Sequence, residues 1–128
     1  MEWAAVMMSV LGVIVLTAGC SESSSDTSPR IELLYFEGCP DTPTVRENLI
    51  AALDRMKLGS SLTQIDLVSL PKTDTLRGYG SPTILVNGRD LFGAPVSTST
   101  SVSCRLYPDG PPSSEQIEQK LRAAITGG

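Results

Sequence analysis

The chain of 128 residues is long enough for one domain, and 41% of its residues are hydrophobic, which suits a globular core. It contains no histidine, which excludes a Ser-His-Asp triad, a Cys-His protease pair, a His-ligated zinc site and an imidazole general base. Ten basic residues against 14 acidic ones give a formal charge of −4, so we expect no basic face and no nucleic-acid partner. The residues left with distinctive chemistry are the three cysteines.

The N-terminal segment predicts export. Trp3 to Ala18 is almost entirely apolar, and it is shorter than the ~20 residues that span a bilayer as a helix. The run closes with the small residues Ala18 and Gly19, followed by Cys20 and a serine-rich stretch. A short apolar run that ends in small residues is typical of a secretory signal peptide, which we predict over residues 1–19.

Ala18-Gly19-Cys20 resembles the lipobox of bacterial lipoproteins, in which the cysteine is lipidated and becomes the new N-terminus. The sequence departs from that pattern in having Thr17 where leucine is usual, and no Lys or Arg before the apolar run. We favour lipidation of Cys20 over an uncleaved membrane anchor and over a signal peptide that is cut without lipidation. The resemblance implies an extracytoplasmic protein of the cell envelope, bound to the membrane through a lipid on Cys20.

Residues 20–29 are predicted to be a tether, because Ser21 to Pro29 contains no apolar residue that could be buried. The folded domain is then expected over residues 30–128. Exported compartments permit disulfides. If Cys20 carries a lipid, the thiols that remain are those of Cys39 and Cys104.

The first half of the domain has the pattern strand, helix, strand. Ile31 to Phe36 is a short apolar run that predicts a buried strand, and Glu37 to Pro43 is a turn. A helix should follow, with Gly59 as its C-terminal cap and an apolar stripe formed by Val45, Leu49, Ala52, Leu53 and Met56. Leu62 to Leu70 predicts the second strand, which would lie parallel to the first after a helical crossover.

The second half begins with a hairpin and ends with a helix. Asn87-Gly88 joins two short apolar segments, residues 81–86 and 89–92, which is a strong signal for a tight hairpin. Gly93 to Ser103 is predicted as a loop, and Cys104 to Tyr107 as a possible edge strand. The segment 113–116 resembles a capping box. It starts a closing helix whose apolar stripe is Ile117, Leu121, Ala124 and Ile125.

This order of elements, together with two motifs, resembles the thioredoxin fold of small bacterial thioredoxin-family proteins. Gly38-Cys39-Pro40 places a cysteine between the first strand and the first long helix, and Gly80-Ser81-Pro82-Thr83 resembles the loop with a cis proline before the third strand. The resemblance implies an α/β fold with a four-stranded mixed sheet and flanking helices. It also implies that Ser81 and Pro82 bind substrate, with the backbone of Ser81 offered to a bound peptide.

Cys39 is the candidate nucleophile. The thioredoxin Cys-x-x-Cys motif is replaced here by Cys39-Pro40-Asp41-Thr42, so the second cysteine of that motif is missing. A sulfur at a helix N-terminus faces free N–H groups and the positive end of the helix dipole, which stabilise a thiolate. We expect Thr42 to donate a hydrogen bond to that thiolate and to cap the helix, and Glu37 and Asp41 to oppose the charge. The alternative is an inert buried cysteine.

Cys104 has four possible roles. It can resolve a mixed disulfide on Cys39, or form a static disulfide with Cys39. It can also hold a soft ion such as Cu(I) or Hg(II) together with Cys39. The first three roles require the two sulfurs to approach, with Cα atoms within about 7 Å for a disulfide. In the fourth, Cys104 lies too far away and Cys39 works with an external thiol.

The sequence therefore predicts an exported thioredoxin-like thiol–disulfide oxidoreductase. Cys39 would attack, Cys104 and Thr42 would assist, and the Ser81–Pro82 loop would position a protein or small-molecule thiol or disulfide. No cofactor is expected. The alternative is a soft-metal-binding or redox-inert interaction module on the same fold.

Overall fold

A computed structural model describes residues 28–127 of the chain. The predicted signal peptide, the lipidation site Cys20 and the tether up to residue 27 lie outside the described residues. Among the residues that are described, no helix is both long enough and apolar enough to cross a membrane.

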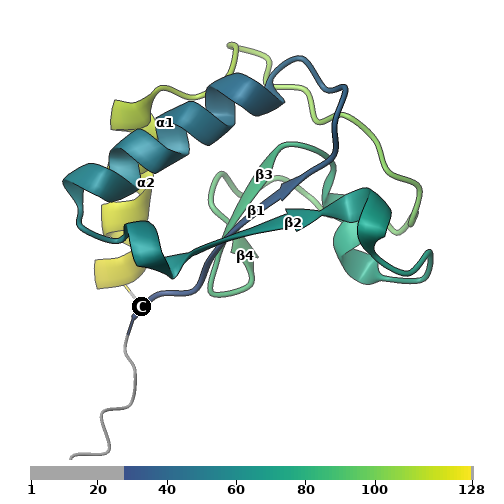
Figure 1. Ribbon diagram of the computed structural model, residues 1–128, viewed down its shortest axis with the longest axis horizontal. Coiled ribbons are helices and arrows are strands. Elements are labelled where there is room, and N and C mark those ends of the chain that lie inside the picture. The colour runs from purple at the N-terminus through teal and green to yellow at the C-terminus, as the bar shows by residue number, and fades with distance from the viewer. Residues whose placement is uncertain (1–27, 128) are drawn as a thin grey trace, which may run out of the picture.

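Four strands form one mixed sheet in the order β2-β1-β3-β4 (Figure 1). β1 (Ile31–Tyr35) pairs in parallel with β2 (Leu62–Asp66) and antiparallel with β3 (Thr83–Val86), which in turn pairs antiparallel with β4 (Arg89–Asp90). The α/β class and the four-stranded mixed sheet are therefore as predicted. β1 and β3 occupy the centre, so the loops at their ends lie next to each other.

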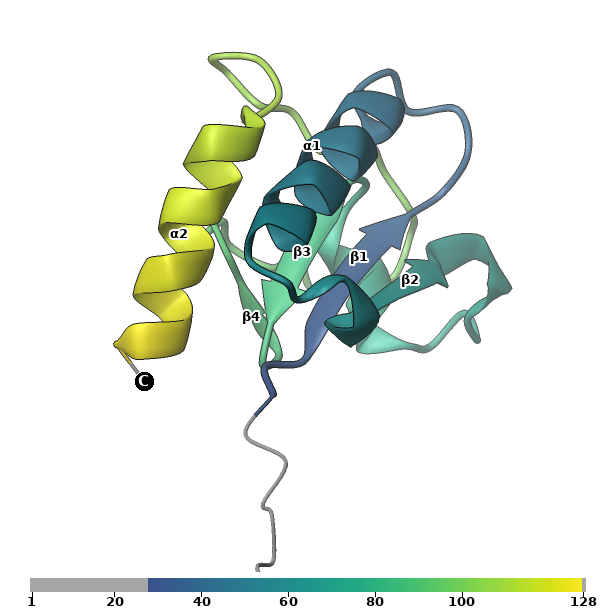
Figure 2. The ribbon, with the colours of Figure 1, turned by 60° about the vertical axis from the view of Figure 1, so that its left-hand side comes forward.

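Two helices cover one face of this sheet, and they pack against each other (Figure 2). They are α1 (Thr42–Arg55) and α2 (Ser114–Thr126). The predicted capping box is confirmed: Gln116 N donates to Ser113 Oγ, and Ser113 N donates to the Gln116 side chain. The buried residues of this face are Ile31, Leu33, Val45, Leu49, Ala52, Leu53, Ile84, Val86, Ile117 and Leu121.

One position of the predicted α2 stripe is wrong. Ala124 is exposed, whereas Ile125 is partly buried and packs against the core. Ile125 follows Leu121 by four positions, and its larger side chain makes the contact that a methyl group does not reach.

The opposite face is covered by short 3-10 turns. Leu34, Leu67 and Leu85 are buried there, and η2 (Leu67–Ser69) and η3 (Thr75–Tyr79) pack over them. The predicted second strand therefore ends at Asp66, not at Leu70. Asp66 Oδ1 accepts a hydrogen bond from Val68 N at 3.0 Å, and this cap starts a turn that places Leu67 in the core.

Two turns position the ends of the elements. At the predicted hairpin, Asn87 has φ 50° and Gly88 has φ 83°, as a two-residue turn requires.

The prediction that Gly59 caps α1 is wrong, because Lys57 takes the left-handed conformation instead, with φ 57°. Leu58 N donates to Leu53 O at 2.8 Å and Lys57 N to Asp54 O at 3.1 Å, which is a Schellman motif. Gly59 begins η1 (Gly59–Ser61).

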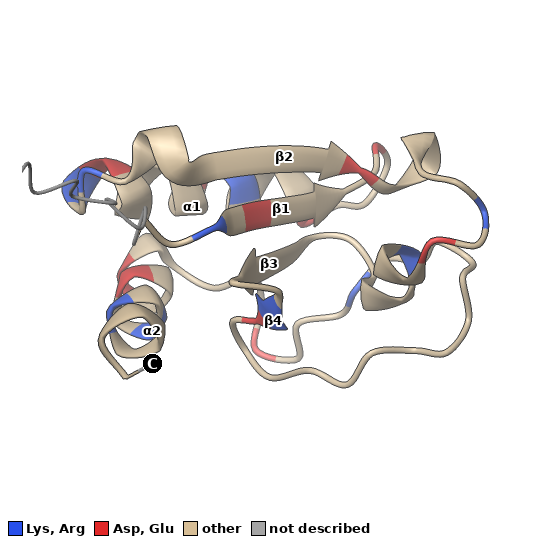
Figure 3. Cartoon of the chain, turned by 90° about the horizontal axis from the view of Figure 1, so that it is seen from below, with Lys and Arg blue, Asp and Glu red and all other residues tan. Residues whose placement is uncertain are grey.

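Basic and acidic residues are interspersed along the helices, strands and turns, as the blue and red segments of Figure 3 show. The uncharged stretch from Leu91 to Cys104 forms the long connection that leaves β4. This connection brings Cys104 back to the sheet.

Candidate functional site: a disulfide at the start of helix α1

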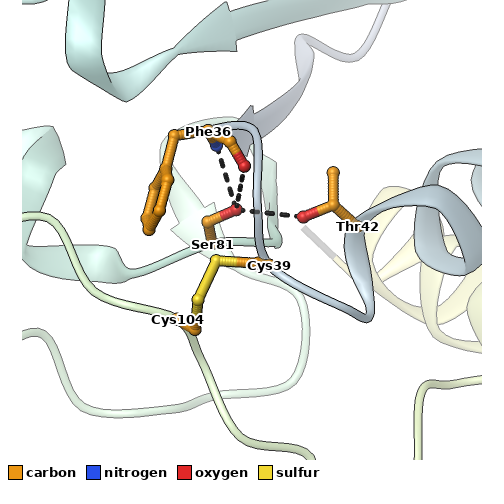
Figure 4. Close-up of a disulfide and its surroundings, with 5 residues drawn as sticks. All are labelled: Phe36, Cys39, Thr42, Ser81 and Cys104. Carbon is orange, nitrogen blue, oxygen red and sulfur yellow. Dashed lines mark hydrogen bonds between the residues drawn. A yellow bond between two sulfur atoms is a disulfide. The ribbon is translucent and has the colours of Figure 1, made fainter.

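Cys39 and Cys104 form a disulfide, with an S–S distance of 2.10 Å and a Cα–Cα distance of 5.6 Å (Figure 4). Cys39 lies in the turn between β1 and α1, and Cys104 lies in the segment between β4 and α2. The Cα–Cα distance is within the range that a disulfide needs. The two sulfurs thus approach each other, and the role in which Cys104 is too distant to take part is excluded.

The two cysteines differ in their access to solvent. Cys39 is 4% exposed, and it lies where the chain enters α1: its carbonyl accepts a hydrogen bond from Thr42 N at 3.2 Å. Cys104 is exposed. One disulfide therefore joins a buried residue at the positive end of a helix dipole to a residue that is exposed.

The start of α1 differs from the prediction. Asp41 is the N-cap residue, and it makes no side-chain capping bond. Thr42 does not cap the helix: it is 2% exposed, and its hydroxyl lies 3.2 Å from the Ser81 hydroxyl. The Glu37 carboxylate is largely exposed and lies 3.9 Å from the guanidinium of Arg46, which counters its charge.

Ser81 connects the three central elements of the site. Its side chain is fully buried, and its hydroxyl accepts a hydrogen bond from Phe36 N at 3.0 Å in addition to its contact with Thr42 (Figure 4). The Ser81–Pro82 peptide bond is cis, as expected from the loop motif. Ser81 therefore ties the end of β1 and the start of α1 to the start of β3.

The backbone of Ser81 is paired with the segment that carries Cys104. Ser81 N donates to Ser103 O at 2.9 Å, and Arg105 N donates to Ser81 O at 2.7 Å. This is one isolated parallel bridge, so the possible edge strand over Cys104 to Tyr107 is not formed. The backbone groups that the resemblance assigns to a bound peptide are thus occupied by the chain itself.

Two side chains hold the same segment in place, and we call Arg105 and Tyr107 the clamp. The Arg105 guanidinium pairs with the carboxylate of Asp90, and both side chains are nearly buried, at 10% and 5% exposed. Arg105 also donates to Thr83 Oγ1 at 3.3 Å. The Tyr107 hydroxyl donates to Pro82 O at 2.8 Å, and burial raises the pKa of Tyr107 to about 12.

The clamp had no signal in the sequence. A single arginine or aspartate in a polar segment is typical of a solvated surface. Asp90 lies in β4, and Arg105 follows the uncharged connection of residues 91–104. Only the tertiary fold shows that these two residues form an ion pair.

Within residues 28–127, no group of three or more histidine, cysteine, aspartate or glutamate side chains could hold a metal ion. Comparison of the chain with protein-family models, with curated proteins and with solved structures finds no match in any of the three.

Proposed function

We propose that the chain is an exported, lipid-anchored thiol–disulfide oxidoreductase of thioredoxin-like fold, with Cys39 and Cys104 as its redox pair. The observation that carries this proposal is the disulfide itself, which joins a cysteine at the start of α1 to an exposed cysteine. A disulfide that serves only stability does not require that one of its sulfurs be accessible. An exchanging one does, because rates of thiol–disulfide exchange depend on access.

The arrangement of elements supports the thioredoxin-like part of the proposal. The cysteine follows the first strand, a long helix comes next, and the cis peptide precedes β3 beside that cysteine. Ser81 lies against the site through its hydroxyl and through its backbone. These are the positions in which the resemblance places the reactive cysteine and the substrate-binding loop.

The environment of Cys39 supports its role as a thiolate. Opening of the disulfide leaves a sulfur at the N-terminal end of a 14-residue helix, whose dipole favours a negative charge. Thr42 and Ser81 are buried beside Cys39 in Figure 4, and we propose that their hydroxyls donate to this charge when the disulfide is open. Both effects stabilise the charged form of the Cys39 sulfur and make it a better leaving group.

A second candidate function has one observation in its favour. When reduced, two cysteines whose Cα atoms lie 5.6 Å apart can present two thiolates to one soft ion, as linear coordination of Cu(I) or Hg(II) requires. Equilibrium dialysis of the reduced protein against Cu(I) measures this, and loss of binding in both Cys39→Ser and Cys104→Ser would favour it.

The experiment that tests the oxidoreductase is transfer of two electrons from a dithiol peptide. Oxidised protein is mixed with the reduced peptide, and disulfide formation in the peptide is followed by intact mass. We expect one peptide disulfide for each protein disulfide lost, formed at least about tenfold faster than with the same concentration of glutathione disulfide. Cys39→Ser and Cys104→Ser should each abolish transfer, whereas Ser99→Ala, a change in the same exposed connection, should not. Transfer no faster than with glutathione disulfide would contradict the proposal.

A further inference from the structure

The two sulfurs of the disulfide are not equivalent targets for an incoming thiolate. Exchange is an in-line displacement, so the attacking sulfur enters opposite the sulfur that leaves. In Figure 4, Phe36, Thr42 and Ser81 are gathered around Cys39, and Cys104 lies on the other side of the bond. Cys39 is 4% exposed, and its neighbours Ser81 and Thr42 are 0% and 2% exposed, so Cys39 Sγ is shielded from an incoming thiolate. Approach to Cys104 comes from the surface, where this residue is exposed.

The leaving-group chemistry points in the same direction. A thiol of lower pKa leaves faster in exchange. Cys39 leaves as a thiolate at the start of α1, where the helix dipole stabilises it. Cys104 lies in an irregular segment and has no helix terminus to stabilise it. Access and the stability of the leaving thiolate therefore both favour attack on Cys104 Sγ with departure of Cys39 Sγ.

We infer that Cys104 is the cysteine that contacts the substrate, and that Cys39 is the internal thiolate. This reverses the order of attack expected from the sequence, and it rests on the proposed function. A substrate thiolate attacks Cys104 Sγ, the Cys39–Cys104 bond breaks, and the electron pair leaves on Cys39 Sγ. The product is a mixed disulfide between the substrate and Cys104. A second substrate thiolate then attacks the substrate sulfur of that bond, and Cys104 leaves as a thiolate.

The sum of the two steps balances. The substrate dithiol loses two electrons and gains a disulfide, and the protein disulfide gains them and becomes a dithiol. The two thiol protons of the substrate end on Cys39 and Cys104 or in solvent, according to pH. In the opposite direction, Cys104 attacks a substrate disulfide, and Cys39 resolves the mixed disulfide by attacking Cys104 Sγ.

The clamp and the backbone bonds of Ser81 fit this assignment, because together they keep Cys104 near Cys39 after the bond opens. The hydrogen bonds of Ser81 with Ser103 and Arg105, and that of Tyr107 with Pro82, do not involve either sulfur. They can persist while the substrate is attached to Cys104. Cys39 is then in position to expel the substrate if the second substrate thiol fails to react.

The test identifies the cysteine that carries the substrate. The full chain, oxidised, is mixed with a single-cysteine peptide, quenched with an alkylating reagent at the earliest times, and mapped by proteolysis and mass spectrometry. We expect the peptide on Cys104 and the alkyl group on Cys39, in at least about tenfold excess over the opposite arrangement. As a second measurement, reduced Cys39→Ser should form a mixed disulfide with a peptide disulfide at least about tenfold faster than reduced Cys104→Ser.

The outcomes distinguish failure of this inference from failure of the proposed function. Peptide found mainly on Cys39 would overturn the inference and leave the oxidoreductase standing. A disulfide that the peptide does not open at all, under conditions that reduce glutathione disulfide, would overturn the proposed function and the inference with it.

Discussion

Ser81 shows how much of the site depends on a residue that does no covalent chemistry. Its hydroxyl joins β1 and α1, while its backbone holds the segment on both sides of Cys104. The relative position of the two cysteines is therefore set by one buried serine and its neighbours. The cysteines could be identified from the sequence, but this role of Ser81 could not, because it depends on pairing with residues 103–105.

At the same scale, Thr42 should influence the Cys39 thiol. Thr42→Val removes the buried hydroxyl that we expect to donate to the thiolate, so the pKa of Cys39 should rise. Thiolate absorbance against pH measures this in the Cys104→Ser background. Thr44→Val, on an exposed position of the same helical turn, is the matched control and should leave the pKa unchanged. Equal curves for the two variants would contradict a role for Thr42.

Tyr107 should make the fold sensitive to alkaline pH. Its pKa is raised, chiefly by burial, from 10.0 to about 12. The stability contributed by the neutral phenol is fully present below pH 10.0 and is lost as pH rises through about 12. Urea unfolding should therefore show a steeper loss of stability over this range in the wild type than in Tyr107→Phe.

The same variant should lose about 1 kcal/mol at neutral pH, because its hydrogen bond to Pro82 O is removed. Tyr79→Phe serves as the control, since it removes a hydroxyl outside the clamp. Parallel stability curves for the wild type and Tyr107→Phe above pH 10.0 would count against burial of the phenol.

The elements themselves could largely be predicted. Apolar periodicity located both helices, and Asn87-Gly88 located the hairpin, because these signals are local. The errors at Gly59 and after Asp66 are also local, and each has its own cause. α1 ends in a Schellman motif with Lys57 in the left-handed conformation, and β2 ends where the Asp66 side chain caps the next turn.

The end of α1 gives a prediction at this scale. Lys57 occupies the left-handed position of the Schellman motif, which costs a residue with a Cβ atom roughly 1 kcal/mol relative to glycine. Lys57→Gly should therefore stabilise the domain by about 1 kcal/mol in urea unfolding. Lys57→Ala keeps the Cβ atom and should give no such gain. Equal stabilities of the two variants would show that the left-handed conformation is not the cause.

The disulfide acts at the scale of the whole molecule. It joins residues separated by 65 positions and encloses α1 and all of β2, β3 and β4. This pairing could not be predicted from the sequence, which left four roles open for Cys104, because contact across such a separation depends on the complete fold. The fold places the end of β1 beside the start of β3, and the bridge between Ser81 and Cys104 then places Cys104 beside Cys39.

Reduction should destabilise the domain without unfolding it. Closing a loop of this length stabilises by about 4 kcal/mol on the chain-entropy account, so reductant should lower the free energy of unfolding by about that amount. The core and the clamp do not depend on the sulfurs, and they should keep the reduced protein folded. The double variant Cys39→Ser/Cys104→Ser should be insensitive to reductant. A reduced protein that has lost its fold would indicate a structural bridge.

The most direct test of the central claim is a redox titration of the protein, in which alkylation and intact mass give the fraction of Cys39–Cys104 disulfide at each potential. The exchanging pair that we propose should have a midpoint between about −120 and −270 mV, the range of oxidoreductases that act by exchange. A midpoint below about −300 mV would contradict the proposal and identify the disulfide as a static structural bond.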